Sequence, residues 1–153
     1  MFDRKQWPAG PWDDEPDSFA FEHAGFKCKG ERNNHGVWCG YVLVPNDHPI
    51  RYAGEGELDA LECHGGVTWS RDDGDGDFWV GFDCGHAWDF SPGMAAQMPS
   101  HVLLPGEKYR DLAYVKQNCR SMAEQLNLKT KASRAACRLG GLAVAREVEE
   151  LDD

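Results

Sequence analysis

Hydrophobic and polar residues follow two different patterns along the chain, and the change falls at Pro105-Gly106. Before this point, short runs are β-branched and aromatic or alternate with polar residues, which predicts strands. These runs are residues 26–29, 37–44, 67–70 and 78–84. After it, apolar residues recur every three or four positions, which predicts a helix. The chain should therefore hold a β-rich part followed by a helical part.

The helical part carries one long apolar stripe, and charged residues such as Arg110, Lys116 and Arg120 lie off it. Its members are Tyr109, Leu112, Val115, Cys119, Met122 and Leu126. We predict a helix from about residue 107 to 127, a shorter one from Ser133 to Gly140-Gly141, and a last turn or two from Leu142 to Leu151. A helix this long has to bury its stripe, and the sheet is the available surface. The predicted fold class is therefore α+β, a single domain with an antiparallel sheet and a long amphipathic helix packed on one face.

The strand at 78–84 has two distinct faces. Phe78, Val80, Phe82 and Cys84 share one face, and Asp83 lies on the other. The large apolar set should face the helix, so we expect the thiol of Cys84 to be buried.

The Asp/Gly-rich segment 72–77 lies between the strands 67–70 and 78–84, which predicts a hairpin with a long turn. A calcium loop of the EF-hand type is excluded, because Phe78 and Cys84 fall where such a loop needs glycine and glutamate. No helices flank the segment either, so a solvated turn is the better interpretation.

Proline density sets the expected organisation of the chain. Residues 1–20 hold three prolines and two tryptophans among acidic side chains, which argues against a regular element there. We therefore expect an irregular acidic arm at 1–25, an α+β core domain at 26–140, and a short acidic C-terminal helix or tail at 141–153. No repeat of 20–50 residues is visible.

Composition and charge exclude several classes of protein. The 153 residues are 41% hydrophobic, enough for a core, and carry a net charge of −10. That charge divides into −11 over 1–106, +5 over 107–140 and −4 over 141–153. A broad basic surface for duplex nucleic acid is thereby excluded, whereas an acidic body able to imitate nucleic acid and a basic patch for a small anionic ligand are not. The longest apolar runs are four residues, far short of a membrane span.

The six cysteines contain no Cys-x-x-Cys pair, and no secretory signal precedes them. These features argue against a zinc ribbon or a thioredoxin-type site. We expect reduced, buried thiols in a cytoplasmic protein.

Potential ligands crowd into three short segments between residues 48 and 89. They are His48, Glu62, Cys63, His64, Asp83, Cys84, His86 and Asp89. The two glycines after His64 allow a sharp turn and the close approach of a ligand. His86 and Asp89 lie just past the end of the predicted strand 78–84, where loop residues often form sites.

Three interpretations of these residues stay open. The first is a divalent transition metal, with zinc preferred, held by His64, His86 and Asp89, with His48 as a spare ligand. The second is metal-free acid–base catalysis by His64 or His86, with Asp83 or Asp89 orienting the imidazole. A Cys84 nucleophile is disfavoured by its burial. The third is structural, with the histidines bonding backbone groups in glycine-containing turns and the aspartates capping loops.

Several motifs resemble a group of small phage and prophage proteins of unassigned function. They are Gly40-Tyr41-Val42-Leu43-Val44-Pro45, His48-Pro49, His64-Gly65-Gly66-Val67-Thr68, Gly81-Phe82-Asp83-Cys84-Gly85-His86-Ala87-Trp88-Asp89, and the helix from Tyr109 to Leu126. The resemblance covers roughly residues 40 to 127 and departs at Asn118, where that group often has an acid. It implies a viral accessory protein in the cytoplasm of a bacterial host.

Two functions from different classes follow. The first is a phage-type accessory protein that binds and modulates a host component, as an inhibitor of host defence, with a host protein or a small anionic ligand as partner. The alternative is a small metal-dependent hydrolase acting on a phosphate ester or nucleotide at His64, His86 and Asp89.

Overall fold

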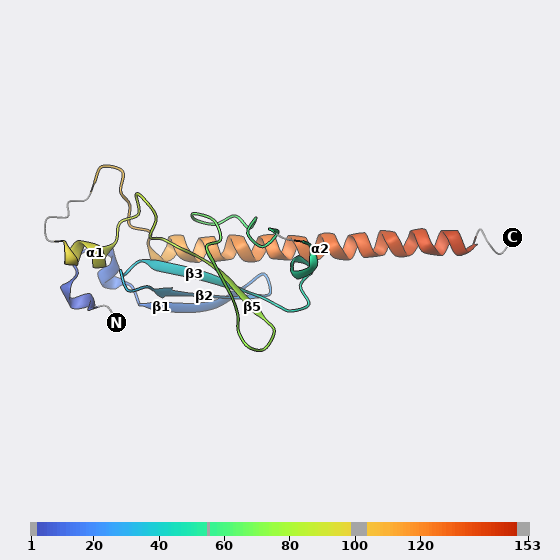
Figure 1. Cartoon of the computed structure of the whole chain (residues 1–153), viewed down its shortest axis with the longest axis horizontal. Coiled ribbons are helices and arrows are strands. Elements are labelled where there is room, and N and C mark those ends of the chain that lie inside the picture. The colour runs from blue at the N-terminus through green and yellow to red at the C-terminus, as the bar shows by residue number, and fades with distance from the viewer. Residues whose placement is uncertain (1–2, 55, 99–103, 150–153) are drawn as a thin grey trace.

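The structure, a computed structural model, describes residues 3–54, 56–98 and 104–149. Five antiparallel strands form one sheet in the order β1-β2-β3-β5-β4, and the long helix α2 crosses one face of it (Figure 1). The strands are β1 (Ser18–His23), β2 (Phe26–Arg32), β3 (Trp38–Val44), β4 (Trp69–Asp72) and β5 (Phe78–Asp83). The helices are α1 (Pro92–Gln97) and α2 (Leu112–Glu149), with 3₁₀-helices η1 (Arg4–Gln6), η2 (Pro11–Asp14) and η3 (Pro49–Tyr52). The predicted α+β fold in a single domain is confirmed.

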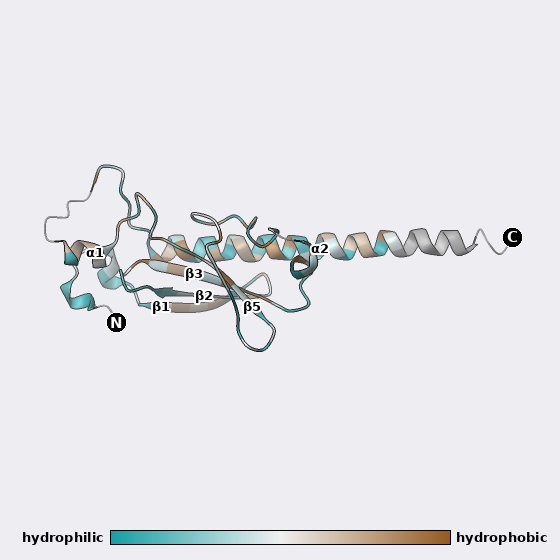
Figure 2. Cartoon of the chain, viewed as in Figure 1, coloured by the Kyte–Doolittle hydropathy of each residue, from teal (hydrophilic) through white to brown (hydrophobic). Residues whose placement is uncertain are grey.

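The core lies between the sheet and the first half of α2. Val115, Cys119, Met122 and Leu126 are each 0% exposed, which confirms the predicted stripe. Hydrophobic and hydrophilic residues alternate along this half of α2 (Figure 2). Burying these side chains supplies most of the stability of an amphipathic helix.

The sheet face under α2 follows the predicted parity of β5. Val80, Phe82 and Cys84 are at most 1% exposed, so the thiol of Cys84 is buried as expected. Gly40 of β3 lies opposite Phe82, and a Cβ there would lie 2.6 Å from the Phe82 ring and 2.9 Å from the Cys119 Sγ. A glycine is therefore needed at position 40 for the helix to approach the sheet this closely.

The helix α2 differs from the prediction at both ends. It begins at Leu112 because Asp111 caps it, its Oδ1 accepting from the Tyr114 backbone N–H at 2.8 Å. It then continues without a break through Ser133 and Gly140 to Glu149, where the sequence predicted a shorter helix followed by a last turn or two. A glycine in a helix costs only about 1 kcal/mol, so Gly140 does not by itself end the helix.

The N-terminal segment is more ordered than its prolines predicted. The strand β1 lies within 1–25, where we expected an irregular arm, and begins just after the last proline of the segment, Pro16. Trp12 is 5% exposed and stacks on Phe90 at a centroid distance of 5.3 Å. The segment therefore packs against the domain.

Glu15 joins this N-terminal segment to the start of α2. Its Oε2 accepts from the backbone N–H of Leu112 at 2.8 Å and from the indole N–H of Trp38 at 2.9 Å. A carboxylate at a helix N-terminus is favoured by the helix dipole. The first turn of α2 is therefore stabilised by a residue about a hundred positions earlier in the chain.

The β4–β5 hairpin has the predicted long turn. Asp72 and Asp73 accept hydrogen bonds from the backbone N–H groups of Gly74 and Asp75, at 2.7 and 2.9 Å. Asp77 accepts from the backbone of Asn46 at 3.1 Å. These carboxylates stabilise the turn and its neighbour, in line with the solvated-turn interpretation.

Across the parts of the chain that the structure describes, no helix has the length and apolar character needed to cross a membrane.

Candidate metal centre

The site combines two loops that converge over the start of α2. His64 comes from the loop between η3 and β4, and His86 and Asp89 come from the loop after β5. One potential ligand atom from each residue lies within 4.8 Å of the other two. These three residues could hold a metal ion, as the sequence predicted.

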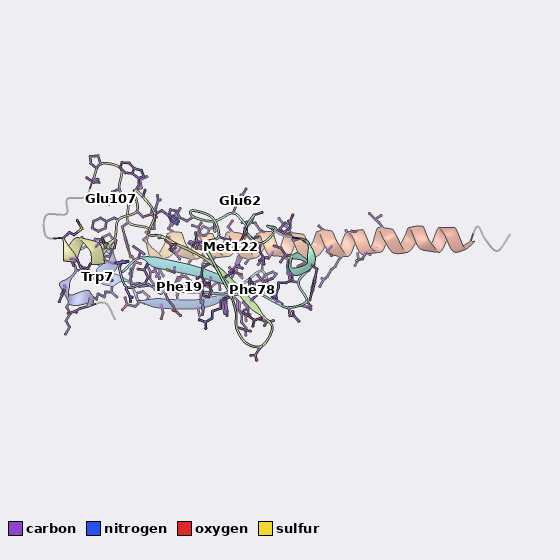
Figure 3. The ribbon with its side chains drawn as sticks, viewed as in Figure 1. Trp7, Phe19, Glu62, Phe78, Glu107 and Met122 are labelled. Carbon is purple, nitrogen blue, oxygen red and sulfur yellow. The ribbon has the colours of Figure 1, made fainter. Side chains whose placement is uncertain are left out.

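The loop that carries His64 is fixed on α2 by two amide side chains. Asn118 Oδ1 accepts from the His64 backbone N–H at 2.9 Å. Further along the helix, Gln125 bonds both the backbone N–H and the carbonyl of Glu62, at 2.8 Å each. Glu62 lies beside α2 (Figure 3). The backbone of this loop is therefore held before any ligand arrives.

Gly65 determines how closely the two histidines approach. Its φ of +68° lies in the left-handed region, and a Cβ on it would lie 2.4 Å from the Cε1 of His86. Without that Cβ, the rings of His64 and His86 lie edge to face with centroids 5.5 Å apart. Gly66 is also left-handed, at φ +81°, but a Cβ there would meet no atom within 4 Å.

Both ring nitrogens of His64 are engaged. Nδ1 lies 2.8 Å from the hydroxyl of Tyr114, and Nε2 lies 2.6 Å from Oδ2 of Asp89. With Nε2 donating its proton to Asp89 and Nδ1 accepting from the Tyr114 hydroxyl, both nitrogens are satisfied. A metal ion at Nε2 would replace that proton, and Nε2 and Oδ2 would then lie further apart than 2.6 Å, because each zinc–ligand distance is about 2 Å.

Asp89 is the anionic centre of the site, with its side chain 1% exposed. Its Oδ1 accepts from Arg110 Nε at 2.9 Å, and its Oδ2 accepts from the His86 backbone N–H at 3.1 Å. Burial alone would raise the pKa of Asp89, but the hydrogen bonds from His64 and Arg110 outweigh it and leave that pKa below its ordinary value. The carboxylate is therefore ionised at neutral pH and fixed in position.

His86 supplies the least satisfied atom of the site. Its Nδ1 is buried and has no hydrogen-bond partner among the described residues. The nearest carboxylate oxygens are Asp89 Oδ2 at 3.7 Å and Asp83 Oδ1 at 3.8 Å, both beyond hydrogen-bond distance. A buried, unpaired imidazole nitrogen is costly, so it marks a position where a ligand would be stabilising.

The other two predicted residues have different surroundings. His48 caps η3, with Nδ1 accepting from the Ile50 backbone N–H at 3.1 Å and Nε2 lying 2.9 Å from the Leu126 carbonyl oxygen. Both of its ring nitrogens are thus in use, and the structure does not bring it to the other three. Asp83 stays at the edge of the site, where Oδ1 accepts from Gly85 and Oδ2 from Thr68.

Three residues of the site were missed by the sequence reasoning. Arg110, Tyr114 and Asn118 are spaced by four residues, and all three contact His64 or Asp89. That spacing on one side of a helical segment was the available signal.

No family model, curated protein sequence or solved structure matches the chain.

Proposed function

We propose that the protein is a small metal-dependent hydrolase acting on a phosphate ester or nucleotide, with one divalent transition metal ion held by His64, His86 and Asp89. The observation that carries the proposal is the buried, unpaired Nδ1 of His86, which lies 3.7 Å from Asp89 Oδ2 within the group of three potential ligands. A purely structural cluster would be expected to satisfy that nitrogen within the protein.

The donor set supports zinc as the ion. Two imidazole nitrogens and one carboxylate oxygen are typical zinc ligands, and three protein ligands leave a coordination position open, as in catalytic zinc sites. The Tyr114 hydroxyl on the far nitrogen of His64 is the kind of outer contact that orients a metal-binding imidazole. Bound there, the ion would supply Lewis-acid activation of water and of a phosphoryl oxygen.

Arg110 supports an anionic substrate. Its Nε is held by Asp89, and its guanidinium lies 5.0 Å from the Tyr114 ring centroid. This anchoring fixes the guanidinium at the site while the side chain remains 25% exposed. The terminal N–H groups of an arginine suit a phosphate oxygen in geometry and in charge. Arg110 would thus bind and orient the phosphate group.

A shallow depression beside Asp83 supports a nucleotide over a simple phosphate. It has a volume of about 260 Å³, and its lining includes Tyr41, Thr68, Trp69 and Asp83. Trp69 is 40% exposed and meets the Tyr41 ring edge to face at 5.1 Å. An exposed indole face is suited to stacking on a base or packing on a sugar. Asp83, shared by the depression and the edge of the site, would accept a proton there.

Hydrolysis assays test this function. Wild-type protein should release phosphate from p-nitrophenyl phosphate or from a nucleotide, lose that activity with a chelator, and regain it with zinc. The variant His86→Ala should be inactive, and His35→Ala, which removes an exposed histidine outside the site, should keep full activity. Activity that survives the chelator would favour acid–base catalysis by His64 and Asp89 without a metal.

A second candidate function is the binding of a host component, and the exposure of Trp88 favours it. This side chain is 62% exposed, although it lies between His86 and Asp89, and its φ of 74° is unusual for a bulky residue. Tryptophan is enriched among the residues that dominate protein interfaces. If the protein binds a host protein here, Trp88→Ala should abolish capture of one stoichiometric partner from host lysate, and Trp69→Ala should not.

A further inference from the structure

The face of the sheet opposite α2, here called the open face, carries large apolar side chains. Among the described elements, α2 is the one helix that contacts the strands, and it lies on the other face (Figure 1). The open face of an antiparallel sheet is usually polar where water covers it. Here the alternation of β3, β4 and β5 directs four large residues to it, Tyr41, Leu43, Trp69 and Trp79.

The three aromatic rings form two adjacent stacking positions. The Tyr41 ring lies over Gly81, where a Cβ would lie 2.3 Å from Tyr41 Cδ1, and it meets Trp69 edge to face at 5.1 Å. Trp69 pairs with Gly81, so Trp79 is its diagonal neighbour on the next strand. Diagonal positions lie about 7–8 Å apart, enough for each indole to take its own base. Open sheets that stack two or three bases on aromatic side chains are a recurrent means of binding single strands.

Each indole also lines a hollow of its own. Trp79 and Lys29 line one of about 420 Å³, and Trp69 and Asp83 line the depression of about 260 Å³ described above. A mononucleotide would fill one of these hollows. The pair favours a polymer that places one unit in each.

Positive charge lies beside the rings. The ammonium of Lys29 lies 4.4 Å from the Trp79 ring centroid and 5.6 Å from that of Tyr41, and Arg71 pairs with Trp79 across β4 and β5. A cation on an exposed ring is held less strongly than a stacked base. A strand that offers a phosphate to Lys29 and a base to Trp79 can therefore replace this contact. These cations favour a phosphate-bearing ligand over a neutral sugar, which would stack on the same rings.

The charge of the open face suits a single strand and not a duplex. Residues 1–106 carry a net charge of −11, yet three basic residues on the strands of this face match three acidic ones. A duplex hides its bases and is held mainly through its phosphates, which requires a broad basic surface. A single strand held by stacking needs few phosphate contacts. The charged residues are Lys27, Lys29, Arg71, Glu22, Glu31 and Asp83.

The open face is continuous with the candidate metal centre. Asp83 ends β5 on this face, and its Oδ1 lies 3.8 Å from His86 Nδ1. We infer that the open face binds a single-stranded nucleic acid, with bases on Trp69 and Trp79, and that this strand is the substrate of the metal centre. Its use as substrate rests on the proposed function, whereas its binding does not. In hydrolysis the hydroxyl of one water bonds to phosphorus, one ester phosphorus–oxygen bond breaks, and the leaving oxygen takes the remaining proton.

Fluorescence anisotropy of a fluorescein-labelled oligothymidine of about ten nucleotides tests the binding to full-length protein. Trp69→Ala and Trp79→Ala should each weaken it about 5- to 100-fold, because each loses one stacked base. Tyr52→Ala is the matched control, since it removes a ring that is 74% exposed but lies outside the sheet, and it should bind as wild type does. Circular dichroism verifies the folds. Wild type without saturable binding at about 100 μM protein, or equal affinity in all three variants, would overturn the inference.

Salt dependence and competition test the class of ligand. Lys29→Ala should reduce the slope of log affinity against log salt by about 0.7, the loss of one phosphate contact, and Lys131→Ala, at an exposed lysine on α2, should not change it. Unlabelled oligothymidine should displace the probe, and the neutral sugar cellohexaose should not. Protein that binds cellohexaose and not the oligonucleotide would overturn the inference.

Cleavage of the same oligonucleotide separates the inference from the proposed function. Wild type with zinc should cleave it, whereas His86→Ala should still bind it but leave it intact. Hydrolysis of p-nitrophenyl phosphate by a wild type that does not bind the oligonucleotide would overturn the inference and leave the proposed function standing. Binding without hydrolysis of either substrate would contradict the proposed function and leave the open face as a binding site.

Discussion

The hydroxyl of Tyr114 orients the imidazole ring of His64 at the site. Because the Tyr114 hydroxyl lies on Nδ1, the second nitrogen of the ring is directed at Asp89. Asp89 is held by Arg110 and by the His86 backbone N–H, whereas the Tyr114 hydroxyl is the contact that holds the far nitrogen of His64. Loss of a hydrogen-bond partner of a metal-binding histidine commonly weakens metal affinity or activity.

Tyr114→Phe should therefore weaken metal binding about 10- to 100-fold while leaving the fold intact. Competition with a chromophoric chelator measures the affinity, and circular dichroism verifies the fold. Tyr52→Phe is the matched control, because it also removes a tyrosine hydroxyl that is hydrogen bonded, to the Asn46 carbonyl, but at an exposed position away from the site. Equal effects of the two substitutions would contradict the positioning role of Tyr114.

Substitutions at the two adjacent glycines distinguish the cost of backbone strain from the effect of a changed site geometry. Gly65→Ala and Gly66→Ala both introduce a side chain at positive φ, at a cost of about 1 kcal/mol or more in the free energy of unfolding. Only the Cβ at position 65 meets the His86 ring, at 2.4 Å. Urea unfolding should show both variants destabilised, whereas metal titration should show lost affinity for Gly65→Ala alone.

The cysteines differ in burial and should therefore differ in reactivity. Burial raises the pKa of Cys28, Cys39 and Cys63 to about 11 and that of Cys119 to about 12, and it raises the pKa of Cys84 further still. At pH 8 these five side chains carry little thiolate, the reactive form, and reactivity should increase only as the pH approaches those values. Cys137 is free and exposed on α2. Thiol titration at pH 8 should count about one fast cysteine in native protein and all six in guanidinium; several fast thiols in native protein would contradict the burial.

At the scale of elements, the hydrophobic pattern predicted most of the secondary structure. The strands β3 and β5 were predicted within one residue, because buried alternation and aromatic content coincide there. The alternating Ser18–His23 strand was missed, because the prolines up to Pro16 dominated the interpretation of that segment. The unbroken α2 was missed because local signals at Ser133 and Gly140 favour helix ends and do not enforce them.

The attachment of the N-terminal segment to α2 is a contact that the sequence could not indicate. Glu15→Ala should lower the free energy of unfolding by about 2 kcal/mol, because the Leu112 backbone N–H and the Trp38 indole both lose a charged partner. Glu22→Ala, at an exposed position on β1, should change it by less than about 0.5 kcal/mol. Chemical denaturation of both variants measures the difference, and equal stabilities would contradict the capping role of Glu15.

At the scale of the whole molecule, the net charge of −10 conceals a segregated distribution. The basic segment 107–140 divides between two parts of the fold. Arg110 contributes to the site on the sheet, and Arg134 and Arg138 are exposed on the second half of α2.

The sequence could indicate part of the candidate site. The ligand types in neighbouring loops were visible, so His64, His86 and Asp89 were predicted together. The contacts of Tyr114 and Asn118 were not visible, since they depend on how α2 lies across the loops. The apolar stripe placed Arg110 off the face that packs on the sheet, and the pattern gave no sign that Arg110 bonds Asp89.

The central claim is that His64, His86 and Asp89 bind one metal ion. Metal analysis of protein purified without a polyhistidine tag tests it most directly, with His86→Ala and His35→Ala analysed in parallel. The account predicts about one equivalent of zinc or another divalent transition metal in wild type and in His35→Ala, and a large loss in His86→Ala. Less than about a tenth of an equivalent in wild type, with none taken up on reconstitution, would contradict it.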